Sequence, residues 1–123
     1  MYFLSVETSF SAAHQIKGHE GSCKRLHGHN WKVQVEVSAE KLDKLGIAID
    51  FQKLRALTKQ VLNILDHQYL NQLSPFKEMN PTAENLASYI YEQIDSKLPG
   101  GIKMKQVSLW EGEKYCVQYN KGK

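Results

Sequence analysis

The alternation of apolar and polar residues from Trp31 to Val37 limits the possible folds of this chain more than any other feature. Every odd position in this stretch is tryptophan or valine, and every even position is polar. A period of two predicts a β-strand with one buried and one exposed face. The even positions from Tyr2 to Phe10 are mostly apolar, which predicts a second half-buried strand at the start of the chain.

Two helices are expected in the middle of the chain. Asp50 can cap the first helix, whose apolar positions recur at helical spacing to about Leu65. The segment NPTAEN opens the second helix, with Asn80 or Thr82 as its cap, and the apolar stripe continues to Leu98. The Pro-Gly-Gly sequence that follows is expected to end this helix.

Two further strands are expected over residues 103–111 and 114–119, around a turn at Gly112. The order strand, strand, helix, helix, strand, strand predicts a single α+β domain over residues 1–123. Its four-stranded antiparallel sheet would carry both helices on one face and leave the other face uncovered. The last strand would add aromatic and branched side chains to a sheet surface, namely Tyr115, Val117 and Tyr119. We therefore expect a homo-oligomer that associates through strands or sheet faces.

The composition is typical of a globular protein and argues against several other classes. The chain has 123 residues, 41% of them hydrophobic, and a net charge of +3 without a basic cluster, so no nucleic-acid partner is expected. No apolar run is long enough for a membrane helix, and the first ten residues resemble a strand more than a signal peptide. Two cysteines, Cys23 and Cys116, argue against a disulfide framework. We expect a cytoplasmic location and no membrane partner.

Three histidines are expected to meet at one end of the buried sheet face. His27 and His29 share parity with Trp31 and the valines that follow it, and His14 shares parity with the apolar positions of the first strand. If the two strands pair, all three imidazoles reach the same end of the same face. Three neutral imidazoles suit zinc and leave its fourth position open, as in catalytic zinc sites.

Two interpretations of Cys23 stay open at this point. The cysteine lies in a polar loop four residues before His27, so its thiolate could close the metal site as a fourth ligand. Its neighbours Lys24 and Arg25 would favour the thiolate, which also suits a catalytic thiol. Cys116 lies in the last expected strand and is interpreted as structural.

Asp66, His67 and Glu111 are further candidates for chemistry. A carboxylate that orients a histidine is typical of acid–base catalysis, although Asp66 and His67 face each other only if the helix end is broken. The alternative is a histidine stabilised by the dipole at a helix C-terminus. Glu111 shares parity with apolar positions and could accept two adjacent N–H donors of a ligand, or it could lie at an exposed turn.

The order and spacing of these motifs resemble those of a known enzyme family. The pattern is His14, then CKRLHGH over residues 23–29, then Asp66-His67, then PTAEN over residues 81–85, then Glu111. It resembles the 6-pyruvoyl-tetrahydropterin synthase family and covers nearly the whole chain. It looks closest to the 6-carboxytetrahydropterin synthase branch of queuosine biosynthesis, because three residues separate the cysteine from His-Gly-His.

The resemblance implies the tunnelling fold (T-fold), a ββααββ subunit whose sheets join into a barrel in a trimer. Two stacked trimers would form a homohexamer with its active sites between neighbouring subunits. The implied zinc ligands are His14, His27 and His29, the implied catalytic residues are Cys23, Asp66 and His67, and the residues implied to contact the pterin are Glu111, Thr82 and Glu84. Thr82 and Glu84 could equally be explained by helix capping.

The implied reaction is the zinc-dependent conversion of 7,8-dihydroneopterin triphosphate to 6-carboxy-5,6,7,8-tetrahydropterin, with release of acetaldehyde and triphosphate. Two alternatives remain. One is a pyruvoyl-type synthase of the same family, which eliminates triphosphate without cleaving a carbon–carbon bond. The other is a non-catalytic module that binds a metal or a pterin. The chain departs from the pattern of this family at two positions. Trp31 stands where family members more usually have tyrosine or phenylalanine, and Gly112 stands where many of them have threonine.

Overall fold

The structure is a computed structural model that describes residues 1–18 and 26–122. Its longest elements are the strands β1 (Tyr2–His14) and β2 (His27–Ala39), of 13 residues each. They pair antiparallel in unbroken register, from Tyr2 opposite Ala39 to His14 opposite His27. Both predicted strands are thus confirmed, and both extend further toward the histidines than their apolar alternation alone indicates.

The described strands form one five-stranded sheet in the order β3-β1-β2-β4-β5. Strand β4 (Ile102–Glu111) pairs antiparallel with β2 and with β5 (Tyr115–Tyr119), and the two predicted strands around Gly112 are confirmed. The prediction of four antiparallel strands is wrong in one respect, because the two-residue strand β3 (Gln68–Tyr69) pairs in parallel with β1 at Ala12 and Ala13. A strand of two residues is too short to show a period in the sequence.

A single backbone conformation creates strand β3. His67 follows the first helix and has a φ of 58°, in the left-handed region that is rare outside glycine. Its N–H donates to the carbonyl of Ser11. The chain therefore turns sharply at the helix end and runs beside the end of β1. Two 3₁₀ turns, η2 (Leu70–Gln72) and η3 (Ser74–Phe76), continue toward the second helix.

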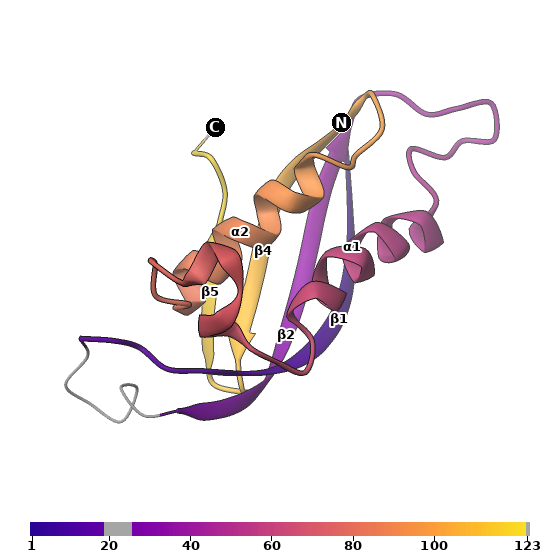
Figure 1. Ribbon diagram of the computed structural model, residues 1–123. Helices are drawn as coiled ribbons and strands as arrows, with labels where there is room; N and C mark the ends of the chain where they lie inside the picture. Colours follow the sequence, from indigo (N-terminus) through magenta and orange to yellow (C-terminus); the bar gives the residue numbers. More distant parts are fainter. Residues whose placement is uncertain (19–25, 123) are drawn as a thin grey trace.

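Both helices lie on the same face of the sheet (Figure 1). Helix α1 (Phe51–Leu65) begins at the predicted cap Asp50, whose carboxylate accepts from the N–H of Gln52, and it packs on β1. Helix α2 (Ala83–Asp95) packs on β4 and β5, and Thr82 is its cap.

Helix α2 ends earlier than the apolar stripe predicts. Its last residue is Asp95, and Leu98 packs against the core from beyond the helix. The N–H groups of Lys97 and Leu98 bond three residues back, to Ile94 and Asp95, so the chain continues in tighter turns. Leu98 therefore keeps its apolar contact although the helix has ended.

The two faces of the sheet differ in polarity and burial, because only one of them is covered by helices. The face under the helices is apolar and buried, with Phe10, Val33, Val35, Val107 and Leu109 in its core. Val117 and Tyr119 also pack on this side, while Tyr115 is 71% exposed. The last strand thus adds Val117 and Tyr119 to the covered face of the sheet, and its expected part in association between subunits stays a prediction. None of the described helices is long and apolar enough to cross a membrane.

Candidate functional site

The register of β1 and β2 brings the three predicted histidines together. His14 lies directly opposite His27, and His29 lies two residues further along the same face. Trp31 forms the floor beneath them, because its side chain is fully buried and its Nε1 donates to the carbonyl of Ala12 at 3.3 Å. The predicted convergence of the imidazoles is confirmed.

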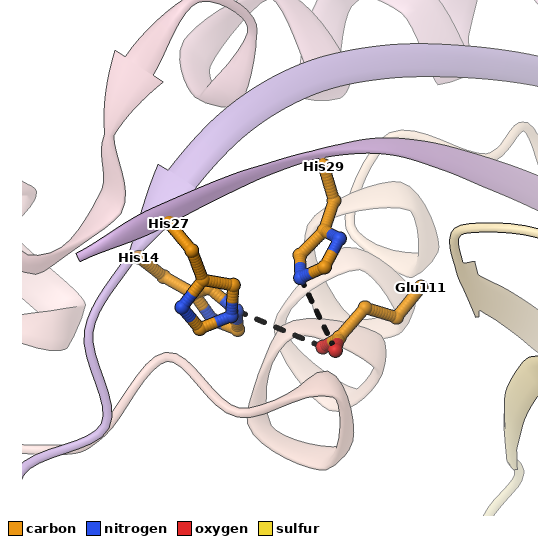
Figure 2. Close-up of side chains that lie close together, drawn as sticks. All are labelled: His14, His27, His29 and Glu111. Atoms are coloured by element: carbon orange, nitrogen blue, oxygen red, sulfur yellow. Dashed lines mark hydrogen bonds and ion pairs between the residues drawn. The ribbon is translucent and has the colours of Figure 1, made fainter. Parts of the chain in front are cut away.

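Glu111 completes the cluster from the neighbouring strand. It is the last residue of β4 and lies opposite Trp31 in the register, so its side chain projects from the buried face, as predicted. One carboxylate oxygen lies 3.3 Å from His29 Nε2 and the other 3.7 Å from His14 Nε2. Figure 2 shows the carboxylate pointing at the imidazoles.

The main chain fixes the tautomer of His14. Its Nδ1 lies 2.7 Å from the carbonyl oxygen of Pro81, and a carbonyl can only accept, so Nδ1 carries the proton and donates. The lone pair of Nε2 then faces His27 Nε2 at 2.9 Å. Burial lowers the pKa of both His14 and His29, which keeps these rings neutral. Sequence analysis missed the Pro81 carbonyl, because a main-chain acceptor leaves no signal in side-chain identity.

The cluster meets the requirements of a metal site. One donor atom from each of His14, His27, His29 and Glu111 lies within 4.8 Å of the others. The ring nitrogen Nε2 of His29 is buried and makes no hydrogen bond with the described residues. A tetrahedral ion with ligands at about 2.0–2.1 Å separates its donors by roughly 3.3 Å, and the measured separations of 2.9, 3.3 and 3.7 Å bracket that value. The residues therefore fit a divalent metal ion.

Asp66 and His67 form the predicted carboxylate–histidine pair. The helix break that the pairing requires is present, and His67 Nδ1 lies 3.0 Å from Asp66 Oδ1. The main-chain N–H of Ser11 donates to the same oxygen at 2.9 Å. This backbone hydrogen bond, together with His67, lowers the pKa of the Asp66 carboxyl. Asp66 is therefore a carboxylate at neutral pH.

The Asp66–His67 pair lies apart from the histidine cluster of its own chain. Neither residue belongs to the metal-binding group found among the described residues. His67 is 81% exposed and lines a groove of about 570 Å³ together with Ser11, Asn30 and His29, the last of which belongs to the cluster. The pair therefore lies outside the donor group of the cluster, although the groove beside it reaches the cluster at His29.

The remaining predicted residues divide into two groups. Thr82 caps α2 by accepting from the N–H of Asn85, and Glu84 is an exposed acid in the first turn of this helix. Both residues are accounted for by helix stability, so their contact with a pterin stays a prediction. Cys23 lies outside the described residues, and its catalytic role also stays a prediction.

Comparison with known proteins agrees with this geometry. Residues 3–122 match the family described as 6-pyruvoyl tetrahydropterin synthase. The chain is 42% identical to a dihydroneopterin monophosphate aldolase of Pyrococcus furiosus, over 89% of this chain and 90% of that protein. It is 39% identical to the 6-carboxy-5,6,7,8-tetrahydropterin synthase of a Synechocystis species, over 81% of each.

Solved structures show the same fold. The 6-pyruvoyl tetrahydropterin synthase of Caenorhabditis elegans superposes with a TM-score of 0.83 at 28% identity, over 98% of this chain and 96% of that one. The family match covers nearly the whole chain, and the relatives align over most of their own length. The chain therefore belongs to the 6-pyruvoyl tetrahydropterin synthase family.

Proposed function

We propose that this protein is a zinc-dependent 6-carboxytetrahydropterin synthase of queuosine biosynthesis. It would convert 7,8-dihydroneopterin triphosphate and water into 6-carboxy-5,6,7,8-tetrahydropterin, acetaldehyde and triphosphate. The convergence of three imidazoles and one carboxylate within 4.8 Å carries the proposal. The relatives named 6-carboxytetrahydropterin synthase, at 29–39% identity, support the choice of product.

Each residue of the cluster has a defined part in the proposal. His14, His27 and His29 would hold the zinc through their Nε2 atoms, and the Pro81 carbonyl orients His14. When bound, zinc would act as a Lewis acid toward the hydroxyl and carbonyl groups of the substrate side chain. Glu111 lies within reach of the same ion, but in this proposal its carboxylate would accept hydrogen bonds from a ring N–H and the amino group of the pterin, which leaves the fourth position of the zinc open.

Proton transfer would fall to Cys23 and His67. Asp66 accepts from His67 Nδ1, which leaves Nε2 of this ring to take up or deliver a proton at the substrate side chain. Cys23 would exchange protons at the substrate side chain as thiolate and thiol. Since the ring is reduced by tautomerisation, the reaction needs no external reductant.

The position of His67 supports an active site shared between subunits. The imidazole is 81% exposed and lies outside the cluster of its own chain. In a homohexamer of two stacked trimers, the Asp66–His67 pair of one subunit would serve the histidine cluster of a neighbour. Strand β5 is an edge of the sheet, and β1 is covered on its outer side only at β3, so both offer main-chain groups for such an assembly. The cytoplasmic location stays a prediction.

The relative of 42% identity favours a second candidate function. Its name, dihydroneopterin monophosphate aldolase, indicates cleavage within a pterin side chain of a monophosphate. On this chain, such a reaction would break the bond between the first and second side-chain carbons. The second carbon would leave as the aldehyde of glycolaldehyde phosphate, and the first would take up a proton to give a hydroxymethyl pterin. The same zinc site and proton-transfer groups would serve both reactions.

Product analysis by mass spectrometry tests the proposal. Zinc-loaded protein is incubated separately with 7,8-dihydroneopterin triphosphate and with the monophosphate. A carboxy-tetrahydropterin with acetaldehyde supports the proposed synthase, and a hydroxymethyl pterin from the monophosphate establishes the aldolase instead. A pyruvoyl product indicates the pyruvoyl-type synthase. If the zinc-loaded protein leaves both substrates unchanged, the chain is a non-catalytic binding module.

A further inference from the structure

The segment between α1 and α2 holds the buried side chain of His14. The imidazole is 2% exposed, and its Nδ1 donates to the Pro81 carbonyl at 2.7 Å. Pro81 is itself buried and stands two residues before α2 begins. This carbonyl decides which ring nitrogen carries the proton, and so decides which one is left to bind a metal.

Asn85 fixes the residues on both sides of Pro81. Its main-chain N–H donates to Thr82 Oγ1 at 3.1 Å, and its side-chain Nδ2 donates to the Asn80 carbonyl at 2.8 Å. The proline ring fixes its own φ angle. With both neighbours held as well, the Pro81 carbonyl has little freedom to rotate away from His14. The side chain of Asn85 thus holds the residue before Pro81, and its main-chain N–H holds the residue after it, although neither hydrogen bond is made to the Pro81 carbonyl itself.

The main chain after His14 is held by the same segment. The amide of Asn80 accepts from the N–H of Lys17 at 2.9 Å and donates to its carbonyl at 2.8 Å. The amide of Asn71 pairs in the same way with Gln15, at 2.9 and 2.8 Å. Two side-chain amides therefore replace a neighbouring strand beyond the end of the β1–β2 pairing.

We propose that Asn85 and Asn80 are positioning residues for the metal site. Asn85 orients the Pro81 carbonyl, and Asn80 anchors the chain that carries His14, so together they aim Nε2 of His14 at the cluster. This inference rests on the proposed function, since it takes His14 as a metal ligand. It gives the PTAEN motif a role in metal binding in addition to the helix cap.

Loss of a group that orients a metal-ligating histidine typically lowers metal affinity by roughly tenfold to a hundredfold. A purely structural role predicts a different result, in which metal affinity changes only as far as the fold is destabilised. The positioning role and the structural role can be separated by placing a carboxylate in each helix. A carboxylate at the start of a helix is stabilised by the helix dipole, and one near the end is not.

The test compares Asn85→Asp with the matched control Asn63→Asp. Asn85 lies in the first turn of α2, where aspartate is favourable for the helix but cannot donate to the Asn80 carbonyl. Asn63 is exposed near the end of α1, where aspartate is unfavourable for the helix. Helix α1 is not the helix that follows the Pro81 segment, so this substitution leaves that segment unchanged. Zinc affinity is measured by competition with a chelator, and stability by denaturant unfolding of the metal-free proteins.

We expect Asn85→Asp to lower zinc affinity roughly tenfold to a hundredfold, while its unfolding midpoint falls no further than that of Asn63→Asp. We expect Asn63→Asp to keep the zinc affinity of the unchanged protein. In zinc-loaded protein with labelled histidine, the Nδ1 proton of His14 should exchange slowly with water, and Asn85→Asp should speed this exchange.

Three outcomes would overturn the inference in different ways. Unchanged zinc affinity and unchanged proton exchange in Asn85→Asp would make the asparagine a structural residue only. A loss of affinity that Asn63→Asp shares, in proportion to stability, would lead to the same conclusion. A zinc affinity that survives His14→Ala in the parent protein would instead remove His14 from the ligand set, and the inference with it.

Discussion

The histidine cluster and the Asp66–His67 pair have opposite surroundings in the same chain. The cluster is built on two long paired strands and a third neighbouring strand, above a fully buried tryptophan. The pair stands at a helix end, with the ring of His67 81% exposed. The cluster holds its donors on neighbouring strands, whereas the pair is an oriented carboxylate and histidine beside an open groove that His29 also lines.

The proposed shared active site would use this difference, with the cluster of one subunit and the pair of a neighbour as its two halves. Preorganised donors on rigid strands suit a metal ion, which demands fixed distances. An exposed histidine such as His67, oriented by a carboxylate, suits proton transfer to a substrate that a neighbouring subunit would hold. The largest expected effects therefore come from the cluster, and the smaller ones from the pair.

His27→Ala should have the largest effect. Removal of one of three imidazoles should abolish zinc binding at stoichiometric metal, and turnover should fall by roughly a thousandfold or more because the Lewis acid is lost. Metal content is measured by elemental analysis of the purified protein, and turnover by product formation. Full zinc content in this variant would remove His27 from the ligand set.

Cys23→Ala separates the two interpretations of the thiol. If Cys23 transfers protons, zinc stays bound and turnover falls by at least roughly a hundredfold. If the thiolate is instead a fourth ligand, zinc content or affinity falls with the substitution. Elemental analysis and chelator competition on the same preparation decide between these results.

His67→Ala should keep the zinc and lose activity. The exposed imidazole makes no contribution to the cluster, so zinc affinity should equal that of the unchanged protein. Loss of a general acid–base group should lower turnover by roughly a hundredfold to ten-thousandfold. Turnover within a factor of a few of the parent protein would show that the pair is only a helix end.

Asp66→Asn should give the smallest effect, a changed acid dependence of stability. The pKa of Asp66 is lowered in the folded chain, so on acidification the unfolded chain takes up a proton before the folded chain does. This stabilising contribution is present above the ordinary carboxyl pKa of about 3.9 and is lost as the pH falls through the lowered value. Denaturant unfolding of the metal-free proteins is measured at about pH 6 and about pH 3. The free energy of unfolding should fall less between these two pH values for Asp66→Asn than for the parent protein. Equal losses would contradict the role of the Ser11 hydrogen bond.

Sequence patterns predicted much of the fold because alternation and helical spacing directly reflect burial. The parity of His14, His27 and His29 placed them on one face. The same argument allowed Glu111 to project from an apolar face, but its position beside the histidines depends on the β2–β4 register, which the sequence does not show. Strand β3 could not be predicted, since it depends on one left-handed residue at a helix end. The Pro81 carbonyl and the asparagine pairs escaped prediction for a related reason, because they are contacts of the main chain with residues far away in the sequence.

The most direct test of the shared active site mixes two inactive variants. His27→Ala lacks the metal site, and His67→Ala lacks the proton-transfer group, so neither homo-oligomer should turn over substrate. If the halves meet between subunits, randomly mixed oligomers should regain about a quarter of the parent activity, because some interfaces carry both intact halves. Mixed oligomers that stay inactive, while each variant still assembles with the parent chain, would place both halves in one chain and contradict the account.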